Sequence, residues 1–506
     1  MENIEFVDLD IKCDQNNTDR GMLIPFESLK NVPFEMKRFF IIRGIRDNVA
    51  RGNHSHYRCK QMFVLLNGSL NVQFDDVETV KSFKMDDITK AIIVPENIWC
   101  VMNDISEDCV LLVISSDYYD ESEYCRSYED FKVHWNKLRS NEPNVPVMDL
   151  KKNTQSIRND LTIKFNEMLD RGDYVLGKEL REFEANFSKY VGSEHCVTMS
   201  NGTATLNYAL QILDLGNDAE IITQANTYIA APLAISRAGY NIKLVDCDPD
   251  TLMMDLDKLE QSITEKTKAI IVVHLYGSSP NMERLMEIAK SHNLYVIEDA
   301  AQAHGSTYNG KMLGTFGDMG SFSFYPSKNL GAFGEGGCVV TDNEEFKNKL
   351  ELVRNYGCKE RYKWVVKGTN ERMDTMQAAF LNVKLNHLQE WNDKRRYLAN
   401  IYNNNLQNIS GLVPLTINEN VSSCYHLYIV KATNREKLMA HLKSNNIHTG
   451  IHYPYAFYKS EAYSELNELT FDVTEKIVDE ILSLPMFPEM TEDQVMYVCD
   501  TIKQFY

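Results

Sequence analysis

The pattern of short apolar segments changes about a quarter of the way along the chain, and this change limits the folds that the sequence can adopt. Up to about residue 135, apolar runs of β type follow one another with turns and without helical spacing. Many short strands without intervening helices are typical of a β-sandwich or barrel, so we expect an all-β barrel over residues 1–135. The sequence Asn67-Gly68 predicts a hairpin between two of these strands. The expected strands are 38–43, 61–66, 69–74, 91–95 and 110–115.

After residue 145, segments of strand type alternate with segments of helical spacing, which indicates a mostly parallel sheet with helices on both faces. A long helical stretch over 373–402 then leads into a smaller α+β part that ends at residue 506. The expected helices of the first part are 160–169 and 178–190, and the expected strands are 219–223, 242–246, 269–276 and a run ending at Asp299.

The polar stretch 136–144 ends toward Pro143 and Pro146, a composition that suits a connector. We therefore expect an α/β second domain over residues 145–506. The length of 506 residues agrees with two or three domains, at about 100–200 residues per domain.

A single lysine, Lys328, follows the apolar and aromatic segment Phe322-Ser-Phe-Tyr325 and precedes a glycine-dense loop. We expect this segment, Lys328 included, to be a short strand. A lysine amine, with an ordinary pKa of about 10.4, is a nucleophile at neutral pH only if it is desolvated or held in a Schiff base. For an isolated lysine, a strand end that reaches solvent is the simpler interpretation, and two other segments decide against it.

These two segments supply an acid and the start of a helix. The run ending at Asp299 places a carboxylate at the C-terminal end of a parallel strand, where α/β sheets bind ligands and where it can keep a pyridine nitrogen protonated. In Ser-Asn-Gly-Thr-Ala, Gly202 permits a close approach of the backbone, and free N–H groups of Thr203 and Ala204 could hold a phosphate. A plain helix cap explains that segment equally well. Together with Lys328, the segments supply what pyridoxal 5′-phosphate (PLP) requires.

In order and spacing, these segments resemble the fold-type-I aminotransferases of nucleotide-sugar biosynthesis, the DegT/StrS group, over about residues 145–506. The resemblance implies that Lys328 forms the Schiff base with PLP and that Asp299 faces the ring nitrogen. Asn370, in a Gly-Thr-Asn-Glu-Arg-Met segment, would reach the phosphate of a neighbouring subunit, which implies a homodimer or higher homo-oligomer. The turn at His452-Tyr-Pro454 is interpreted as structural. The remaining implied contacts are Gln302 at the ring hydroxyl, Ser323 and Thr203 at the phosphate, and Tyr228 on the ring.

In the β domain, His54 and His56 stand two positions apart, so on a strand they point to the same face. They could line one cavity, or they could be exposed, or they could be buried in the core with their hydrogen-bonding groups paired there. The metal-binding cupin barrels that this region resembles follow such a pair with a Glu and later place a His after a Pro turn. Here those places hold Lys60 or Gln61 and Cys100, so we expect no metal site.

The segment that begins at Arg46 and continues with Arg51-Gly-Asn-His-Ser-His56 resembles the cupin 3,4-ketoisomerases. The resemblance covers about residues 4–135. Those enzymes act on 4-keto-6-deoxyglucose linked to thymidine diphosphate (dTDP). A base removes the proton next to the ketone and an acid returns one at the former carbonyl carbon, and imidazole can do either at neutral pH. The resemblance implies that His54 and His56 are the acid/base pair, and that Arg46 and Arg51 lie near the pyrophosphate or the developing oxyanion. Which histidine is the base stays open.

The two domains fit consecutive reactions. Isomerisation would give a 3-keto sugar, and a PLP-dependent aminotransferase could then place nitrogen at C3, with glutamate as donor, to give a dTDP-3-amino-3,6-dideoxyhexose. We therefore expect a bifunctional isomerase and transferase. Two alternatives stay open: an aminotransferase acting at C4 beside a non-catalytic sugar-binding module, and a non-enzymatic sensor that retains the fold.

The charge and the cysteines limit the partners and the location. The formal net charge of −19 argues against non-specific binding to nucleic acid or to an anionic membrane. We find neither an apolar run of about 18 residues, which could span a bilayer, nor a secretory signal pattern. The 11 cysteines form no CxxC pair, which fits reduced thiols. We expect a cytoplasmic enzyme whose partners are small molecules and further copies of itself.

Overall fold

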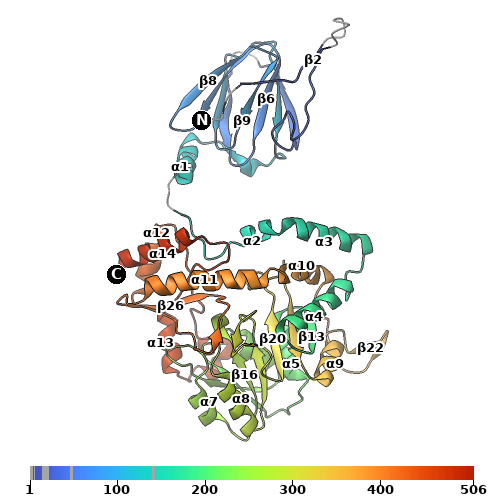
Figure 1. Cartoon of the computed structure of the whole chain (residues 1–506), viewed down its shortest axis with the longest axis vertical. Coiled ribbons are helices and arrows are strands. Elements are labelled where there is room, and N and C mark those ends of the chain that lie inside the picture. Colours follow the sequence, from blue (N-terminus) through green and yellow to red (C-terminus); the bar gives the residue numbers. More distant parts are fainter. Residues whose placement is uncertain (1–3, 5, 14–21, 46–48, 140–142) are drawn as a thin grey trace. The chain divides into compact units, whose positions relative to one another are not determined.

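The structure is a computed structural model of the single chain, and it describes residues 4, 6–13, 22–45, 49–139 and 143–506 (Figure 1). The chain divides into two compact units, Met1–Asn141 and Glu142–Tyr506. Helix α1 (Tyr128–Arg139) extends into the stretch that we predicted as a connector, so the first part of that stretch is helical.

The first unit contains two antiparallel five-stranded sheets. Along β7 (Leu70–Asp75), buried residues alternate with half-buried ones, as expected for a strand with one face on a core. Apolar side chains from both sheets meet in that core. The first sheet has the order β1 (Phe6–Asp8), β9 (Lys90–Val94), β6 (Gln61–Asn67), β11 (Val110–Ser115), β4 (Arg38–Arg43), and the second has the order β12 (Tyr124–Cys125), β5 (Arg51–His56), β10 (Trp99–Asn103), β7, β8 (Val80–Met85).

The expected all-β character is confirmed, and its form is a sandwich of two sheets. Within the described part of the unit, strand pairing does not connect the two five-stranded sheets into a closed barrel. The shorter elements are β2 (Lys12–Cys13), which pairs with β3 (Met22–Leu23), and a 3-10 helix (Glu121–Glu123).

The turn at Asn67-Gly68 leads from one sheet to the other, so the predicted hairpin is wrong. Strand β6 pairs with β9 and β11, whereas β7 pairs with β8 and β10. Gly68 has a φ of 74°, and the following Ser69 N–H donates to the hydroxyl of Ser106 at 2.9 Å. The local sequence specifies a reversal of the chain, but the partner of the next strand depends on distant residues.

The second unit is built on a seven-stranded, mostly parallel sheet, as the sequence predicted. Strand β21 runs antiparallel to both of its neighbours, and the other neighbouring pairs are parallel. The order is β13 (His195–Met199), β21 (Gly337–Thr341), β20 (Met319–Ser323), β17 (Tyr295–Asp299), β16 (Thr267–Val273), β14 (Glu220–Gln224), β15 (Asn241–Val245).

Helices cover both faces of this sheet because its central strands are apolar on both sides (Figure 1). In β16, Ile270 and Val272 belong to one core cluster, whereas Ala269, Ile271 and Val273 belong to the other. The first cluster includes side chains of α4 (Lys178–Val191), α7 (Leu256–Ser262), α8 (Met282–Ser291) and α10 (Thr375–Leu385), and the second includes side chains of α5 (Gly202–Gln211), α6 (Ala230–Ala238) and α9 (Glu344–Val353).

The stretch 373–402, which we predicted as one helix, forms α10 and then α11 (Leu388–Leu406). The break lies at Asn386 and His387, whose N–H groups donate to the carbonyls of Val383 and Lys384. These bonds span three residues instead of four, so they tighten and end the last turn of α10. Two further helices, α2 (Leu150–Ser156) and α3 (Arg158–Arg171), precede α4.

The smaller α+β part has its own core, formed by a three-stranded sheet and by α11, α12 and α14. The sheet has the order β24 (Leu412–Pro414), β26 (Tyr428–Ala432), β27 (Ile481–Leu484), and the helices are α12 (Arg435–Ser444), α13 (Asp472–Glu480) and α14 (Glu492–Phe505). The short elements of the unit are β18 (Thr307–Tyr308), β19 (Lys311–Met312), β22 (Cys358–Glu360), β23 (Lys363–Trp364), β25 (Val421–Ser422) and the 3-10 helices Leu275–Gly277, Phe457–Lys459 and Glu461–Leu466.

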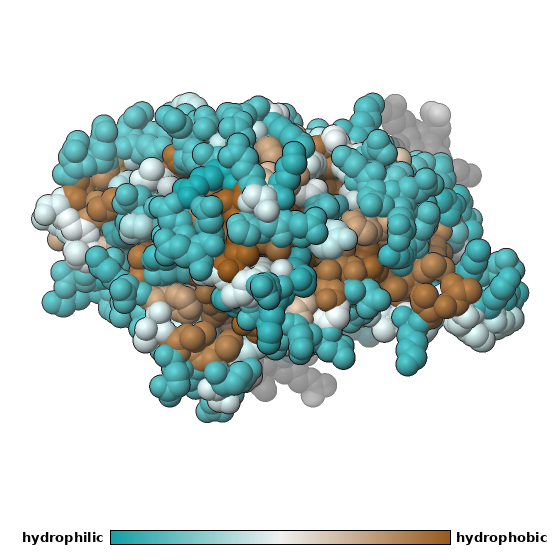
Figure 2. Space-filling view, turned by 90° about the horizontal axis from the view of Figure 1, so that it is seen from below, coloured by the Kyte–Doolittle hydropathy of each residue, from teal (hydrophilic) through white to brown (hydrophobic). Residues whose placement is uncertain are grey.

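Polar side chains dominate the face of the molecule seen in Figure 2, with smaller apolar patches between them. Among the helices of the described residues, none is both long enough and apolar enough to cross a bilayer.

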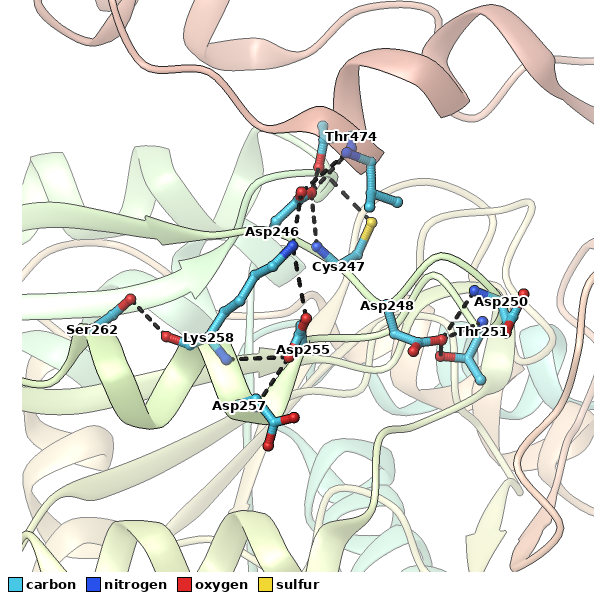
Figure 3. A network of polar contacts seen from close by, with 11 residues as sticks. Asp246, Cys247, Asp248, Asp250, Thr251, Asp255, Asp257, Lys258, Ser262 and Thr474 are labelled. Carbon is cyan, nitrogen blue, oxygen red and sulfur yellow. Dashed lines mark hydrogen bonds and ion pairs between the residues drawn. The ribbon is translucent and has the colours of Figure 1, made fainter.

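A buried carboxylate ties the edge of the seven-stranded sheet to the smaller part (Figure 3). Asp246, directly after β15, accepts hydrogen bonds from the N–H groups of Val473 and Thr474, both at 3.0 Å, and from the Thr474 hydroxyl at 2.8 Å. Lys258 lies 3.2 Å from the same carboxylate. The N–H groups belong to the first turn of α13, which favours an anion. Burial acts to raise the pKa of Asp246, but the hydrogen bonds lower it below its ordinary value.

We expect Asp246→Asn to destabilise the second unit by about 2 kcal/mol, because hydrogen bonds to a charged group contribute about 1.5–3 kcal/mol. Since the pKa of Asp246 is lowered by folding, this contribution is present above the unfolded-state pKa of about 3.9 and is lost as the pH falls through the folded-state pKa. Urea unfolding at pH 7 and at low pH measures both effects. Asp250→Asn, an exposed residue of the same loop, is the control, and an equal loss in both variants would contradict the assignment.

Candidate active sites

Lys328 lies in a turn after the central strand β20, and not within a strand as we predicted. Strand β20 ends at Ser323, and the Lys328 N–H donates to the carbonyl of Tyr325 at 2.8 Å. Pro326, inside this turn, has no N–H with which to continue the strand. Burial lowers the pKa of Lys328 to about 8, although the charge of Asp299 acts in the opposite direction. The amine is therefore neutral more often at pH 7 than that of an exposed lysine.

Asp299 is the last residue of β17 and is buried. Its Oδ1 accepts a hydrogen bond from the N–H of Ala301 at 3.1 Å. Burial raises the pKa of Asp299, while the charges of Lys328 and His274 act to lower it. The structure thus brings Asp299 and Lys328, which we assigned to one site from the sequence, close enough for the charge of each to act on the pKa of the other.

The start of α5 and the end of β20 meet closely. Gly202 is the first residue of α5, and a Cβ added to it would lie 2.6 Å from Cβ of Ser323. Only glycine permits this approach, which brings the first turn of α5 against Ser323. First-turn amides of a helix lack partners within the helix and attract anions, so this cradle suits a phosphate.

Ala204, which we predicted to offer a free N–H to the same phosphate, does not have one. Its N–H donates to Oδ1 of Asn201 at 2.9 Å, because Asn201 caps the helix. The plain helix cap that we weighed from the sequence is therefore present, and it uses one of the two amides expected for the phosphate.

Gln302 connects the sheet to a turn of the smaller part. Its Oε1 accepts a hydrogen bond from the N–H of Tyr276 at 2.6 Å, and its Nε2 donates to the hydroxyl of Tyr453 at 3.0 Å. The ring of Tyr453 lies 5.0 Å from that of Tyr228, which is 52% exposed. We interpreted the turn at His452-Tyr-Pro454 as structural, yet it brings the side chain of Tyr453 against Gln302 and Tyr228. In the sequence, only the aromatic character of Tyr453 could have indicated a role in the site.

Asn370 lies on the exposed surface of the chain, in an isolated bridge with Asn355. The preceding Thr369 forms a hydrogen bond with the hydroxyl of Tyr208. Contact between Asn370 and the phosphate of a neighbouring subunit stays a prediction.

His274 and Glu298 form a buried pair next to Asp299, which the sequence did not reveal. Nε2 of His274 lies 2.8 Å from Oε2 of Glu298, the residue before Asp299, and both side chains are fully buried. Glu298 also accepts hydrogen bonds from the N–H groups of Gly314, Phe316 and Gly317 at 2.7, 2.5 and 2.8 Å. This network fixes the end of β17 and with it the position of the Asp299 carboxylate.

Together these residues fit PLP. The cradle at Gly202 and Ser323 suits the phosphate, the buried Asp299 suits a protonated ring nitrogen, and the desolvated amine of Lys328 suits the aldehyde. His304, packed against Phe322, stays neutral beside them, because burial and the charge of Lys328 lower its pKa to about 3.

A second candidate site lies in the first unit, in a cavity of about 740 Å³ between the sheets. The rings of His54 and His56, both on β5, are 5.0 Å apart, and the Tyr124 ring lies 5.0 Å from the first and 4.3 Å from the second. The sequence predicted the histidines, but it gave no signal for Tyr124, which comes from β12. The hydroxyl of Tyr124 accepts a hydrogen bond from Arg38 at 3.3 Å.

Both imidazoles are held neutral. Burial lowers the pKa of His54, and burial together with the charges of His54, Arg38 and Arg126 lowers the pKa of His56 to about 4. Nδ1 of His54 donates to the carbonyl of Gly52 at 2.9 Å.

Arg51 begins β5 and lines the cavity, whereas Arg46 lies outside the described residues. Cys100, at a position where metal-binding cupins place a histidine, also lines it, and burial raises the pKa of its thiol to about 12. Across the residues that the structure describes, no three His, Cys, Asp or Glu side chains are grouped to hold a metal ion.

Comparison with known families separates the two units. Residues 155–503 match the DegT/DnrJ/EryC1/StrS aminotransferase family. The chain belongs to this family. Members use PLP, so this chain is a PLP-dependent aminotransferase by family. Residues 2–136 match a second family, described as WxcM-like, C-terminal (FdtA), so the chain is a fusion of the two.

Similar proteins cover the aminotransferase unit almost completely. A dTDP-3-amino-3,6-dideoxy-alpha-D-galactopyranose transaminase of Aneurinibacillus thermoaerophilus is 40% identical over 361 residues, 71% of this chain and 99% of the relative. A pleiotropic regulatory protein of Geobacillus stearothermophilus is 39% identical over 368 residues, 72% of this chain and 99% of the relative. The crystal structure of S. venezuelae DesV in complex with a ketimine intermediate has a TM-score of 0.70 at 38% identity and covers 72% of this chain and 98% of that chain.

We expect Gly202→Ala to weaken PLP binding at least tenfold, about 1.4 kcal/mol, because the new methyl group would force α5 away from Ser323. Titration of the apoprotein with PLP, followed by absorbance, measures the affinity. Gly310→Ala is the control, because its added Cβ meets nothing within 4 Å and its strain, at a φ of 80°, arises in a distant turn. Unchanged affinity in Gly202→Ala would contradict the proposed cradle.

Proposed function

We propose that this chain carries out two consecutive steps on one nucleotide sugar. The first unit isomerises dTDP-4-keto-6-deoxyglucose to the 3-keto sugar, and the second transfers an amino group to C3, giving a dTDP-3-amino-3,6-dideoxyhexose. The observation that carries the proposal is the presence in one chain of a histidine pair facing a sugar-sized cavity and of a buried amine beside a buried carboxylate.

The first step needs an acid, a base and a place for a sugar. The cavity volume of about 740 Å³ lies within the range of about 300–1,000 Å³ that small-molecule sites have. His54 and His56 remain neutral at pH 7, so each can accept or donate a proton without first losing a charge. Arg51 at the cavity wall, and Arg46 nearby in the sequence, are the proposed partners of the pyrophosphate or of the developing oxyanion.

The second step depends on PLP, which when bound supplies an electron sink for moving nitrogen between an amino acid and a keto sugar. Lys328 would hold the aldehyde of PLP and, with its lowered pKa, could exchange protons with the substrate carbon near neutral pH. Asp299 would keep the ring nitrogen protonated, and Gln302 would contact the ring hydroxyl. Thr203 and Ser323 would hold the phosphate.

The site of amination follows from the order of the steps. A 3,4-ketoisomerase leaves the ketone at C3, and the Aneurinibacillus relative is named for a 3-amino-3,6-dideoxy sugar. Glutamate is the proposed donor. The homodimer is proposed because Asn370 is exposed where a second copy could use it.

Variants should separate the two steps. We expect His54→Asn and His56→Asn each to slow isomerisation by about 10²–10⁴, the usual contribution of an acid or base, while a supplied 3-keto sugar is still aminated. Lys328→Ala should abolish amination and leave isomerisation intact. NMR of the products formed from dTDP-4-keto-6-deoxyglucose, glutamate and PLP measures both.

The same experiment decides between the proposal and its alternatives. Nitrogen at C4, unaffected by the histidine variants, would show a non-catalytic first unit. A PLP-loaded protein that transfers no amino group to either keto sugar would favour a sensor, the role suggested by the regulatory name of the Geobacillus relative.

A further inference from the structure

Gln61 lies against the histidine pair and has no role in the steps described so far. It is the first residue of β6, is 6% exposed, and lines the same cavity as His54 and His56. Its neighbour Lys60 has an exposed side chain, with its amine 3.8 Å from Glu96. Of the two residues that the sequence placed where metal-binding cupins carry a glutamate, Gln61 is thus the one that faces the site.

The Gln61 side chain contacts one specific atom of His56. Its amide nitrogen lies 3.1 Å from Nε2 of His56, and both side chains are buried. An amide nitrogen is only a donor, so Nε2 of His56 must accept the hydrogen bond. A neutral imidazole with an accepting Nε2 carries its proton on Nδ1.

His54 is held in a complementary way. Its Nδ1 contacts the carbonyl of Gly52, which can only accept, so the proton is on Nδ1 and the lone pair is on Nε2. In His56, Nδ1 is buried and forms no hydrogen bond with any residue that the structure describes. A buried N–H without a partner is costly, and a ligand oxygen in the cavity would satisfy it.

We propose that Gln61 is a positioning residue that occupies Nε2 of His56 and so presents Nδ1–H of His56 to an oxygen of the sugar. The inference rests on the proposed isomerase activity and deepens it. His54, through Nε2, moves the proton between the two carbons. His56 polarises the ketone and passes a proton between the two oxygens, the role that a neutral histidine has in triosephosphate isomerase.

Gln61 also affects when His56 becomes charged. A donor directed at Nε2 opposes its protonation, and the positive groups nearby act in the same direction. Burial is the largest cause of the lowered pKa of His56 and the positive groups add to it, so His56 in the wild-type chain stays neutral down to mildly acidic pH. The titratable and charged groups around it are His54, Arg38, Arg126, Asp117, Tyr124, Cys59 and Cys100, of which Asp117 acts to raise its pKa.

Two substitutions of similar size test the role in the full-length protein. Gln61→Leu removes the donor, so we expect kcat for isomerisation to fall at least tenfold with KM changed less than twofold. Gln61→Glu replaces the donor with an acceptor that attracts a proton to His56. Since its pKa rises, we expect the acidic limb of the kcat/KM profile to move up by more than one pH unit. Gln73→Leu on β7, at a position facing away from the core, is the matched control.

Isomerisation is measured without an amino donor, as the rate at which NMR detects the 3-keto sugar formed from dTDP-4-keto-6-deoxyglucose. Amination of a supplied 3-keto sugar reports that each variant is folded. A kcat and a pH profile that match the wild type in both Gln61 variants would overturn the proposal.

A second measurement does not depend on activity. In ¹⁵N-histidine-labelled protein, with the signals of His56 assigned by comparison with His56→Asn, we expect one tautomer with the proton on Nδ1 and a change of tautomer in Gln61→Glu. A mixture of tautomers, or a proton on Nε2, in the wild type would overturn the proposal. Failure of the wild type to form the 3-keto sugar, with the expected tautomer present, would instead count against the isomerase function.

Discussion

Desolvation of two opposite charges at the end of one sheet is the constraint on which the second unit depends. Asp299 and Lys328 come from neighbouring strands, β17 and the turn after β20, and burial acts to neutralise each of them. The charged form of either group is stabilised by the other or by a ligand, because an isolated charge is costly in an apolar interior. The Glu298 and His274 pair behind Asp299 keeps this arrangement rigid.

In the first unit, the protonation of the site residues is controlled with neutral groups. Among the described residues that line the cavity, no carboxylate pairs with its histidines, which are held by a backbone carbonyl and by an amide. The backbone carbonyl can only accept, and the amide of Gln61 directs its donor nitrogen at His56, so the position of each proton is set before a substrate arrives. The second unit thus controls protonation by burying the opposite charges of Asp299 and Lys328. The first unit controls it through the hydrogen-bond partner of an imidazole nitrogen in each histidine.

Much of this could be predicted from the sequence, for physical reasons. Asp299, Lys328 and Gly202 lie in short segments whose local patterns fix their structure, a strand end, a loop and a helix start. The prediction failed where a distant partner decides the outcome. Asn67-Gly68 turns the chain, but its strands join different sheets. Tyr453 and Tyr124 reach their sites only through tertiary packing, and the amide of Ala204 is used by a cap that competes with a phosphate.

The contact between Asp246 and the start of α13 has a consequence for how the protein is made. It joins residues 228 positions apart, so the edge of the sheet is synthesised long before its partner leaves the ribosome. Tyr453 also comes later in the chain than every strand of the seven-stranded sheet. The nascent chain can therefore hold a folded sheet with an incomplete wall around Lys328, and PLP would meet a finished pocket only after the final helices have docked.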